Sequence, residues 1–379
     1  MENFYKLRDW VPNKITDMSE YHRYGRWLCN NTSPGIIKYL RETPSLIHGH
    51  ERDISKNPTA IEFLIDPKNK RVTSSHADFI WNKHPDVVPY ILNMSNTKFH
   101  NQRTYNHALS CNPSPVVIAY LRENPENIVW DYLCQNTSPL AIEMLRENRN
   151  KINVFCLGLN GSSDAMKLLE EIYLEWRALA RTEEQGPAIV TDDEDENNPV
   201  VMVEEQSYEK YISRLDDNDW EYIWREACRH PAGLKIVLKY NILLDLDTLC
   251  ANPAPEAIEI LSEYMFDNLN WIAISRNPGA IDLLEQVFAQ NYNEEGIYIG
   301  KEDSYDDNDN LQRNPRIYWS QLLQNPAIFT YDYDLMHSTR QALHKDLIEY
   351  YWSPRRIAAY LAKNGDIEDG DIDELEENL

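Results

Sequence analysis

Two histidines and an aspartate stand close together in the stretch His-Gly-His-Glu-Arg-Asp, residues 48–53. Imidazole nitrogens and carboxylate oxygens are common ligands of Zn²⁺ and other divalent metals. His48, His50 and Asp53 are therefore a candidate metal set. The same composition is also typical of a polar loop between two helices. We favour the loop and expect no bound metal.

A second candidate metal site resembles the start of a calcium-binding loop. Asp306, Asn308 and Asn310 have the spacing of its first three ligand positions. Such a loop needs glycine at its sixth position and glutamate at its twelfth. Leu311 and Ile317 occupy these two positions, so the match fails.

Motifs of enzyme active sites are missing from the sequence. It contains no glycine-rich phosphate-binding loop, no nucleophile elbow and no zinc-protease helix motif. Only 12 of the 379 residues are glycine. We therefore expect a protein that is not an enzyme and that uses no cofactor.

Asparagine recurs three residues after a series of apolar anchor residues, and histidine replaces it in two places. A row of such side chains along one edge could contact a ligand. It could instead hold the turn between two helices, by capping or by bonding neighbouring turns. We favour the structural role, for the two histidines as well. The predicted turn residues are Asn31, Asn57, His84, Asn112, Asn136, Asn160, His230, Asn252 and Asn277.

These side chains belong to a repeating unit. The letters LREN at residues 121–124 return at residues 145–148, and each copy follows an Asn-x-Ser-Pro stretch and apolar residues at helical spacing. Asn or Ser followed by Pro is typical of a helix start, because proline at the first helical position loses no hydrogen bond. Each unit is predicted to be two short antiparallel helices, which must stack to bury their apolar faces.

The predicted fold is all-α. It is an α-solenoid of about ten short helix–turn–helix repeats, with a period of about 24–26 residues and with acidic insertions. Four tryptophans lie three residues before their anchors, which places them on one face of the shorter helix. The predicted repeat core is Leu28, Ile54, Trp81, Leu109, Leu133, Leu157, Leu249 and Ile274 with Trp130, Trp224, Trp271 and Trp319.

Four of the six cysteines fall one residue after an anchor: Cys29, Cys134, Cys228 and Cys250. Serine or glycine holds the same place in other units. The position therefore calls for a small residue at a contact between helices, and we expect no redox or metal role for these thiols.

Acidic segments divide the chain. Residues 182–208 are rich in carboxylates and poor in core residues, which is typical of an exposed linker or loop. The expected order is an N-terminal helical repeat array at residues 1–181, the linker at 182–208, a C-terminal array at 209–362 with an acidic insertion at 291–310, and an acidic tail at 363–379.

The charge of the chain is very uneven. Residues 1–180 carry 21 Lys+Arg and 20 Asp+Glu, whereas the remainder carries 16 and 42, and the whole chain has a net charge of -25. Such a surface repels nucleic-acid phosphates and suits a basic partner. No apolar run approaches the roughly 20 residues that cross a bilayer, so we expect no membrane insertion.

The units LSCNPSPVVIAYLRENPENIVW and ISRNPGAIDLLEQ resemble a helical repeat family of giant and large DNA viruses, such as those like mimivirus and the chlorella viruses. The hallmark of that family is Leu-Ser-x-Asn-Pro-x-Ala-Ile followed by Leu-Leu and Asn-Pro. The segment from Asn325 to Gly365 is similar to its closing segment, with Ser353-Pro354-Arg355-Arg356 in place of a His-Pro-x-Arg motif. The family offers no catalytic residues to transfer.

The resemblance implies a non-enzymatic structural protein of a large DNA virus. The concrete expectation is a minor capsid component that links neighbouring capsid proteins through solenoid surfaces. The alternative is an intracellular adaptor that binds host proteins in the manner of ankyrin-type proteins. The expected location is accordingly the virion or the cytoplasm of an infected host cell.

Overall fold

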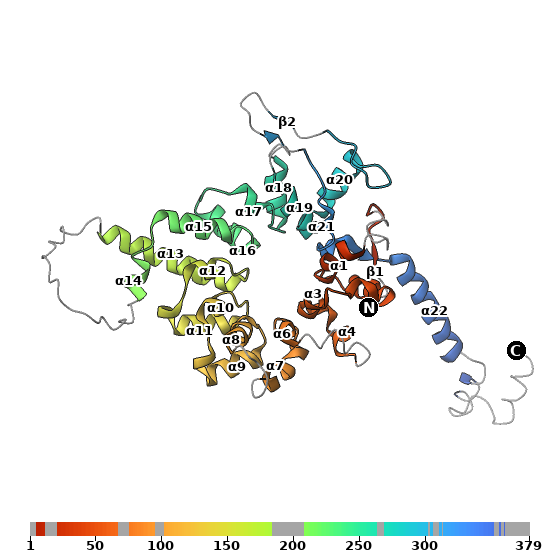
Figure 1. Ribbon diagram of the computed structural model, residues 1–379, viewed down its shortest axis with the longest axis horizontal. Coiled ribbons are helices and arrows are strands. Elements are labelled where there is room, and N and C mark those ends of the chain that lie inside the picture. The colour runs from red at the N-terminus through yellow and green to blue at the C-terminus, as the bar shows by residue number, and fades with distance from the viewer. Residues whose placement is uncertain are drawn as a thin grey trace, which may run out of the picture.

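The protein is mostly helical (Figure 1). The computed structural model describes residues 5–11, 21–66, 76–94, 102–183, 208–263, 269–301, 304–305, 311–312, 314–351, 356–357 and 360. Its four strands there are only two or three residues long, in agreement with the expected all-α class. They are β1 (Tyr5–Leu7), β2 (Ser304–Tyr305), β3 (Leu311–Gln312) and β4 (Phe329–Tyr331).

Short and longer helices alternate along most of the chain. The first half contains α1 (Tyr21–Cys29), α2 (Gly35–Glu42), α3 (Glu51–Lys56), α4 (Ile61–Ile65), α6 (His76–Phe79), α7 (Val88–Met94), α8 (Gln102–Cys111), α9 (Pro115–Glu123), α10 (Trp130–Cys134), α11 (Pro139–Glu147), α12 (Val154–Gly158) and α13 (Ser163–Glu183). The second half contains α14 (Tyr208–Ile212), α15 (Asp217–Ala227), α16 (Pro231–Lys239), α17 (Leu246–Leu249), α18 (Pro255–Glu263), α19 (Trp271–Arg276), α20 (Ile281–Asn291), α21 (Trp319–Leu322) and α22 (Tyr333–Tyr351).

The pair α10 and α11 shows why one unit folds as it does. Ser138 is extended and Pro139 takes the first helical position of α11, where its missing N–H costs nothing. The helix ends at Asn148, whose side-chain amide donates to the Met144 carbonyl oxygen at 2.8 Å. Asn124 ends α9 in the same way, on the Tyr120 oxygen. The last letter of LREN is therefore a helix stop that satisfies a carbonyl left free by the end of the helix.

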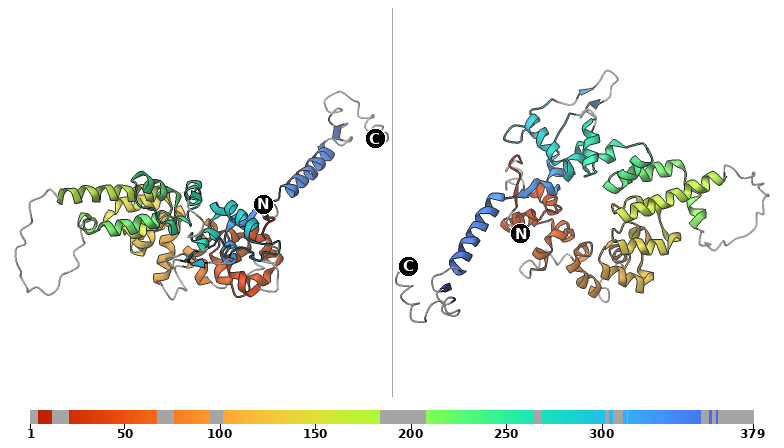
Figure 2. Two further views of the ribbon diagram at one scale, coloured as in Figure 1. Left: turned by 90° about the horizontal axis from the view of Figure 1, so that it is seen from above. Right: turned by 180° about the vertical axis from the view of Figure 1, so that it is seen from behind.

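The helices follow one another around a ring, and the two ends of this path meet (Figure 1). The N-terminal strand β1 pairs antiparallel with β4, with Tyr5 opposite Tyr331 and Leu7 opposite Phe329. Helix α1 also contacts α21. Figure 2 shows the meeting of these segments from two further sides.

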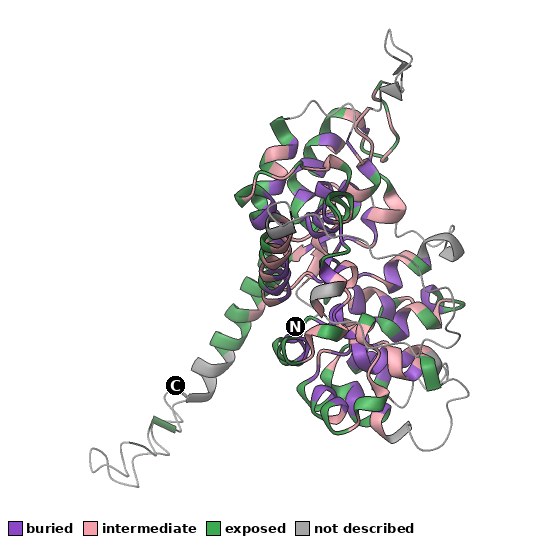
Figure 3. Ribbon diagram, turned by 90° about the vertical axis from the view of Figure 1, so that its left-hand side faces the viewer, coloured by how far each residue is buried: buried purple, intermediate pink, exposed green. Residues whose placement is uncertain are grey.

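Helix α22 leaves this ring and projects from it (Figures 1 and 2). Most of its described residues, at positions 333–345, are exposed, including Tyr333 and Leu343. In Figure 3 the exposed colour covers this helix, whereas buried residues gather where the ring helices face one another.

One apolar core runs through the ring. It extends from Leu7 to Phe329 and includes residues of nearly every unit. Leu121 and Leu145, the equivalent leucines of two LREN copies, have no exposed surface. Burying such a side chain contributes about 1.5–3 kcal/mol, so stacking of units is the main source of stability.

The predicted linker at residues 182–208 lies almost wholly outside the described residues. Helices from before and after it nevertheless pack directly, because α12 contacts α15 and α13 contacts α16. Gly158 faces Ile223 so closely that an added Cβ atom would lie 3.0 Å from the Ile223 Cγ2 atom. Within the described part of the chain, no helix is both long enough and apolar enough to cross a membrane.

Candidate functional site: the turn asparagines

The asparagines that the repeat places in its turns make hydrogen bonds from one unit to the previous one. The Asn136 Oδ1 atom accepts from the backbone N–H of Ser138 at 3.0 Å. Its Nδ2 atom donates to the backbone oxygens of Ser110 and Asn112 at 2.8 and 2.9 Å. Asn136 is fully buried. Its amide therefore shapes its own turn and ties that turn to the preceding unit.

The same arrangement recurs around the ring, with donor–acceptor distances between 2.7 and 3.2 Å. Because buried polar groups are costly without partners, each bond fixes the spacing between neighbouring units. Asn57 donates to Cys29 and Asn31, Asn82 to Ser55 and Asn57, Asn160 to Cys134 and Asn136, Asn277 to Cys250 and Asn252, Asn325 to Ser275 and Asn277, and Asn252 to Cys228.

The first asparagine of the row is bonded to the turn of the last one. Asn31, in the first unit, donates to the backbone oxygens of Leu323 at 2.8 Å and Asn325 at 3.0 Å. This is the bond pattern that joins consecutive units elsewhere. The last turn thus serves as the preceding neighbour of the first turn.

In the third unit His84 holds the turn by capping it, one of the two predicted ways, but the bond to the previous turn comes from another residue. Asn82, rather than His84, donates across to the previous turn, and its Oδ1 atom accepts from the His84 backbone N–H at 3.0 Å. His84 instead caps the following turn through Asp86. The buried Phe79 stands three residues before Asn82, whereas Trp81 is only half-buried. The sequence frame was displaced by two residues here because a histidine–proline pair imitated the asparagine–proline pair.

His230 occupies the turn position of its own unit. That unit lies next to the unit of Asn160. It packs against Gly161, where an added Cβ atom would lie 2.7 Å from the His230 Nδ1 atom. Burial lowers the pKa of His230, and a hydrogen bond to the Leu159 backbone opposes that effect. The imidazole therefore stays neutral more readily than an exposed histidine and joins the turns on either side of the linker.

The row is interrupted at Asn112. Its Oδ1 atom accepts from Ser114 at 2.9 Å, but among the described residues its Nδ2 atom has no partner. Only 2% of the residue is exposed. The bond that would tie this unit to the unit of Asn82 is missing, which marks a weaker junction.

Most of the predicted core residues are buried, but three of the tryptophans, Trp81, Trp130 and Trp319, are only half-buried. Among the tryptophans, Trp224 and Trp271 are buried, whereas Trp130 and Trp319 are half-buried. The apolar anchors with at most 1% exposure are Leu28, Ile54, Leu109, Leu133, Leu157, Leu249 and Ile274.

Ion pairs link successive LREN segments on the surface. The Arg122 guanidinium donates to both carboxylate oxygens of Glu147 in the next unit, at 2.8 and 3.1 Å. Arg146 pairs with Glu171 in the unit after that. Sequence reasoning missed this role, although the return of both charges at one spacing was the signal that could have revealed it.

Side chains outside the row of asparagines also join the two ends of the ring. The hydroxyls of Tyr5 and Tyr331 are hydrogen-bonded at 3.0 Å, and their ring centroids lie 4.7 Å apart. Arg8 donates to the Ala327 backbone oxygen at 2.9 Å. Gly35 leaves the space that the Phe329 ring occupies. We call the contacts of β1 and α2 with β4 the seam.

No family model, curated protein or solved structure matches this chain.

The candidate metal ligands are not brought together. Asp53 pairs with Arg26 at 3.6 Å and accepts from the Asn30 amide at 3.1 Å. Within the described ranges, no three His, Cys, Asp or Glu side chains could hold a metal ion. The rejected calcium loop begins at residues 306–310, which lie outside the described residues.

The repeat cysteines are buried between helices. Burial raises the pKa of the Cys29 and Cys134 thiols to about 12. A thiol with so high a pKa is a poor nucleophile and a poor metal ligand near neutral pH.

Proposed function

We propose that this chain is a non-enzymatic structural protein whose repeats form a closed α-solenoid and hold partner proteins on its surfaces. The observation that carries the proposal is the bond from Asn31 to the turn of Leu323 and Asn325. An open array presents two end units and flexes along its length. A closed array holds its units at fixed positions, which suits a component that connects other proteins.

The viral resemblance makes the proposal concrete: a minor capsid component that links neighbouring capsid proteins in the virion of a large DNA virus. Two features support a linking role. Helix α22 projects from the ring with exposed Tyr333, Met336 and Leu343, as an arm that meets a neighbour would. The excess of carboxylates after residue 180 suits a basic protein partner and disfavours nucleic acid.

Quantitative mass spectrometry of purified virions and of infected-cell lysate tests this proposal. Recovery in virions at a fixed ratio to the major coat protein, even after a high-salt wash, is the expected result. Cross-linking within the virions should then join α22 to a coat protein. Abundance in the lysate together with absence from virions overturns the capsid role and favours the intracellular adaptor.

A further inference from the structure

One step in the row of asparagines lacks its bonds, and it lies far from the chain ends. Most turn asparagines donate to two backbone oxygens of the previous turn, as Asn136 does to Ser110 and Asn112. By the same pattern, Asn112 would donate to the backbone oxygens of Ile80 and Asn82. Its Nδ2 atom instead has no partner among the described residues, although the side chain is buried. We call the step from Asn82 to Asn112 the open junction.

The short helices on the two sides of the open junction also pack loosely. Helix α3 packs closely on α6, α8 on α10 and α10 on α12, whereas α6 and α8 make no comparable contact. Helix α17 packs as sparsely on its neighbours, but there Asn252 still donates to the Cys228 oxygen at 2.7 Å. Among the described steps of the ring, only the open junction lacks both the asparagine bonds and the close packing of short helices.

The open junction is nevertheless held together by other means. The Tyr105 hydroxyl of α8 donates to the Ile91 backbone oxygen of α7 at 3.1 Å. The Trp81 ring lies 6.4 Å from the ring of Tyr132, which belongs to the unit after next. The chain itself also runs from α7 to α8. Opening at this place would therefore turn two parts of the ring about a covalent tether without creating a free end.

The two ends of the ring have no such tether, yet they are bonded more fully. Asn31 makes both of the bonds that Asn112 lacks. Strand β1 pairs with β4 over three residues of each strand. The Arg8 guanidinium donates to the Ala327 oxygen at 2.9 Å and lies 3.6 Å from the Glu285 carboxylate. Each of these contacts must be broken before the ring can open where the chain ends meet.

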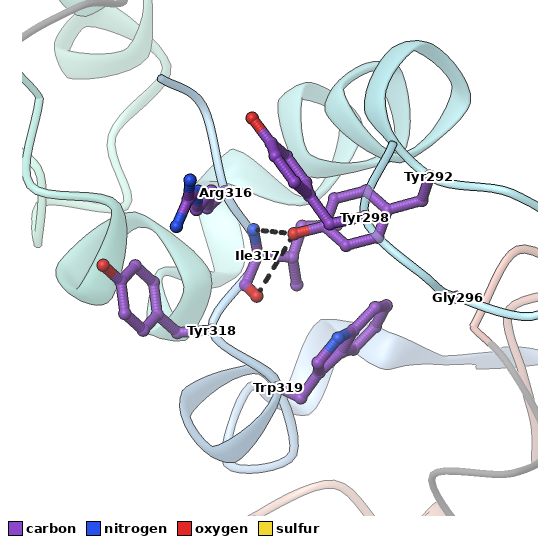
Figure 4. A pocket seen from close by; sticks show the side chains of 7 residues that line it. All are labelled: Tyr292, Gly296, Tyr298, Arg316, Ile317, Tyr318 and Trp319. Carbon is purple, nitrogen blue, oxygen red and sulfur yellow. Dashed lines mark hydrogen bonds between the residues drawn. The ribbon is translucent and has the colours of Figure 1, made fainter. Parts of the chain in front are cut away.

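The insertion after α20 braces the same region from the other side. The Tyr292 hydroxyl accepts from the Ile317 backbone N–H at 2.7 Å, a bond drawn in Figure 4. The Tyr292 ring lies 5.5 Å from the Trp319 ring, edge to face. Tyr292 follows α20 and Trp319 begins α21, so these contacts join the last turn to the unit before it. The last turn is thus held by its predecessor and by Asn31.

We infer that the ring opens as a hinge at the open junction, between α7 and α8, while the seam stays closed. The units on either side of the hinge move as two arcs, and the chain between them is the tether. This movement widens the ring and keeps the bond from Asn31 to Asn325 intact. The inference goes beyond the proposed function, because it describes a motion of the ring that is independent of the partner.

Hydrogen exchange of the full-length chain in low, non-denaturing urea, followed by mass spectrometry, tests the inference. Two helices of similar length serve as reporters: α8, with ten residues, lies at the open junction, and α1, with nine, lies where the ends meet. A helix beside an opening junction loses packing, so the amides of α8 should exchange at least ten-fold faster than those of α1. Exchange in α1 and β1 that is as fast as in α8, or faster, overturns the inference.

A matched pair of variants checks that the bond is missing at Asn112. Asn112→Ala and Asn136→Ala each remove an oxygen that accepts a turn N–H, but only Asn136→Ala also removes two donated bonds. Exchange in the adjoining helices should therefore accelerate at least ten-fold more in Asn136→Ala. Equal acceleration would mean that another group completes the bridge at Asn112, and the hinge would have no basis. The virion measurement tests the structural role independently of both results.

Discussion

The Asn31 side-chain amide donates to the Asn325 backbone oxygen at 3.0 Å, although 294 positions separate the two residues in the chain. Both residues are fully buried. Asn136 makes the same bond to Asn112, only 24 positions earlier. A contact between neighbouring units is thus reused to join the ends of the repeat path.

Replacing one turn asparagine should destabilise the whole chain. Asn136→Ala leaves the carbonyls of Ser110 and Asn112 and the Ser138 N–H without partners in a buried turn. We expect a loss of about 2–4 kcal/mol in the free energy of unfolding, measured by urea denaturation. Asn127→Ala is the control, because that amide meets only the Tyr120 hydroxyl at 3.3 Å and should cost less than about 1 kcal/mol. Equal losses for the two variants would refute a special role for the turn position.

A methyl group at Gly35 should open the seam. Its Cβ atom would lie 2.6 Å from the Phe329 Cδ1 atom and 2.9 Å from the Tyr5 Cβ atom, which is too close for either to remain in place. For Gly35→Ala we expect hydrogen exchange in β1 and β4 to accelerate by about ten-fold or more, as a strand contact loosens. Gly49→Asn is the matched control, because nothing lies within 4 Å of its Cβ position and asparagine tolerates the positive φ of 83°. Unchanged exchange in Gly35→Ala would show that the seam adapts.

The pair of Arg122 and Glu147 should show weak but specific coupling. Both side chains are about half exposed, at 41% and 55%, so solvent screens their attraction. A double-mutant cycle with Arg122→Ala and Glu147→Ala should give about 0.5 kcal/mol of coupling in dilute buffer. In 1 M salt the coupling should vanish. Coupling that persists in salt would mean that packing, rather than charge, joins the two side chains.

His230 should make the protein sensitive to acid. Burial lowers its folded-state pKa below the ordinary value of 6.5. The neutral imidazole therefore contributes its full stabilisation above about pH 6.5. This stabilisation is lost as the pH falls below 6.5 and through the lower pKa of the folded state. The loss of melting temperature between pH 7 and pH 5 should be smaller in His230→Asn, which supplies an amide that does not titrate. Arg229 and Glu226 act on the same imidazole in opposite directions, and both remain in the variant. An equal loss in both proteins would exclude His230 as the cause.

The sequence predicted the helical class because most units carry the same local signals. Proline at the start of α11 and asparagine at its end act within one turn of helix, so they can be read without knowledge of the neighbours. The third unit was misread because local signals disagreed there. His84 and Pro85 imitate a unit start, whereas only the contact with the previous turn shows that Asn82 makes the bridge.

The seam was not predicted. Tyr5 and Tyr331 belong to no repeat, and nothing in their local sequence says that they meet. The path closes because each unit adds a small rotation, and the sum of these rotations depends on packing that a periodic pattern does not encode. The contact of Tyr292 with Trp319 was missed for a similar reason, since the sequence showed residues 291–310 only as an acidic insertion.

The bond between Asn31 and Asn325 has a consequence for how such a chain can evolve. An open array grows or shrinks by duplicating or losing one unit, and its end units carry the adaptation to solvent. Here the first and last turns are each other's neighbours, so an extra unit would separate them by the thickness of two helices. The geometry of the ring therefore fixes the number of units. We therefore expect new functions of such a chain to arise by insertions between units, as at residues 291–310, rather than by changes in the number of units.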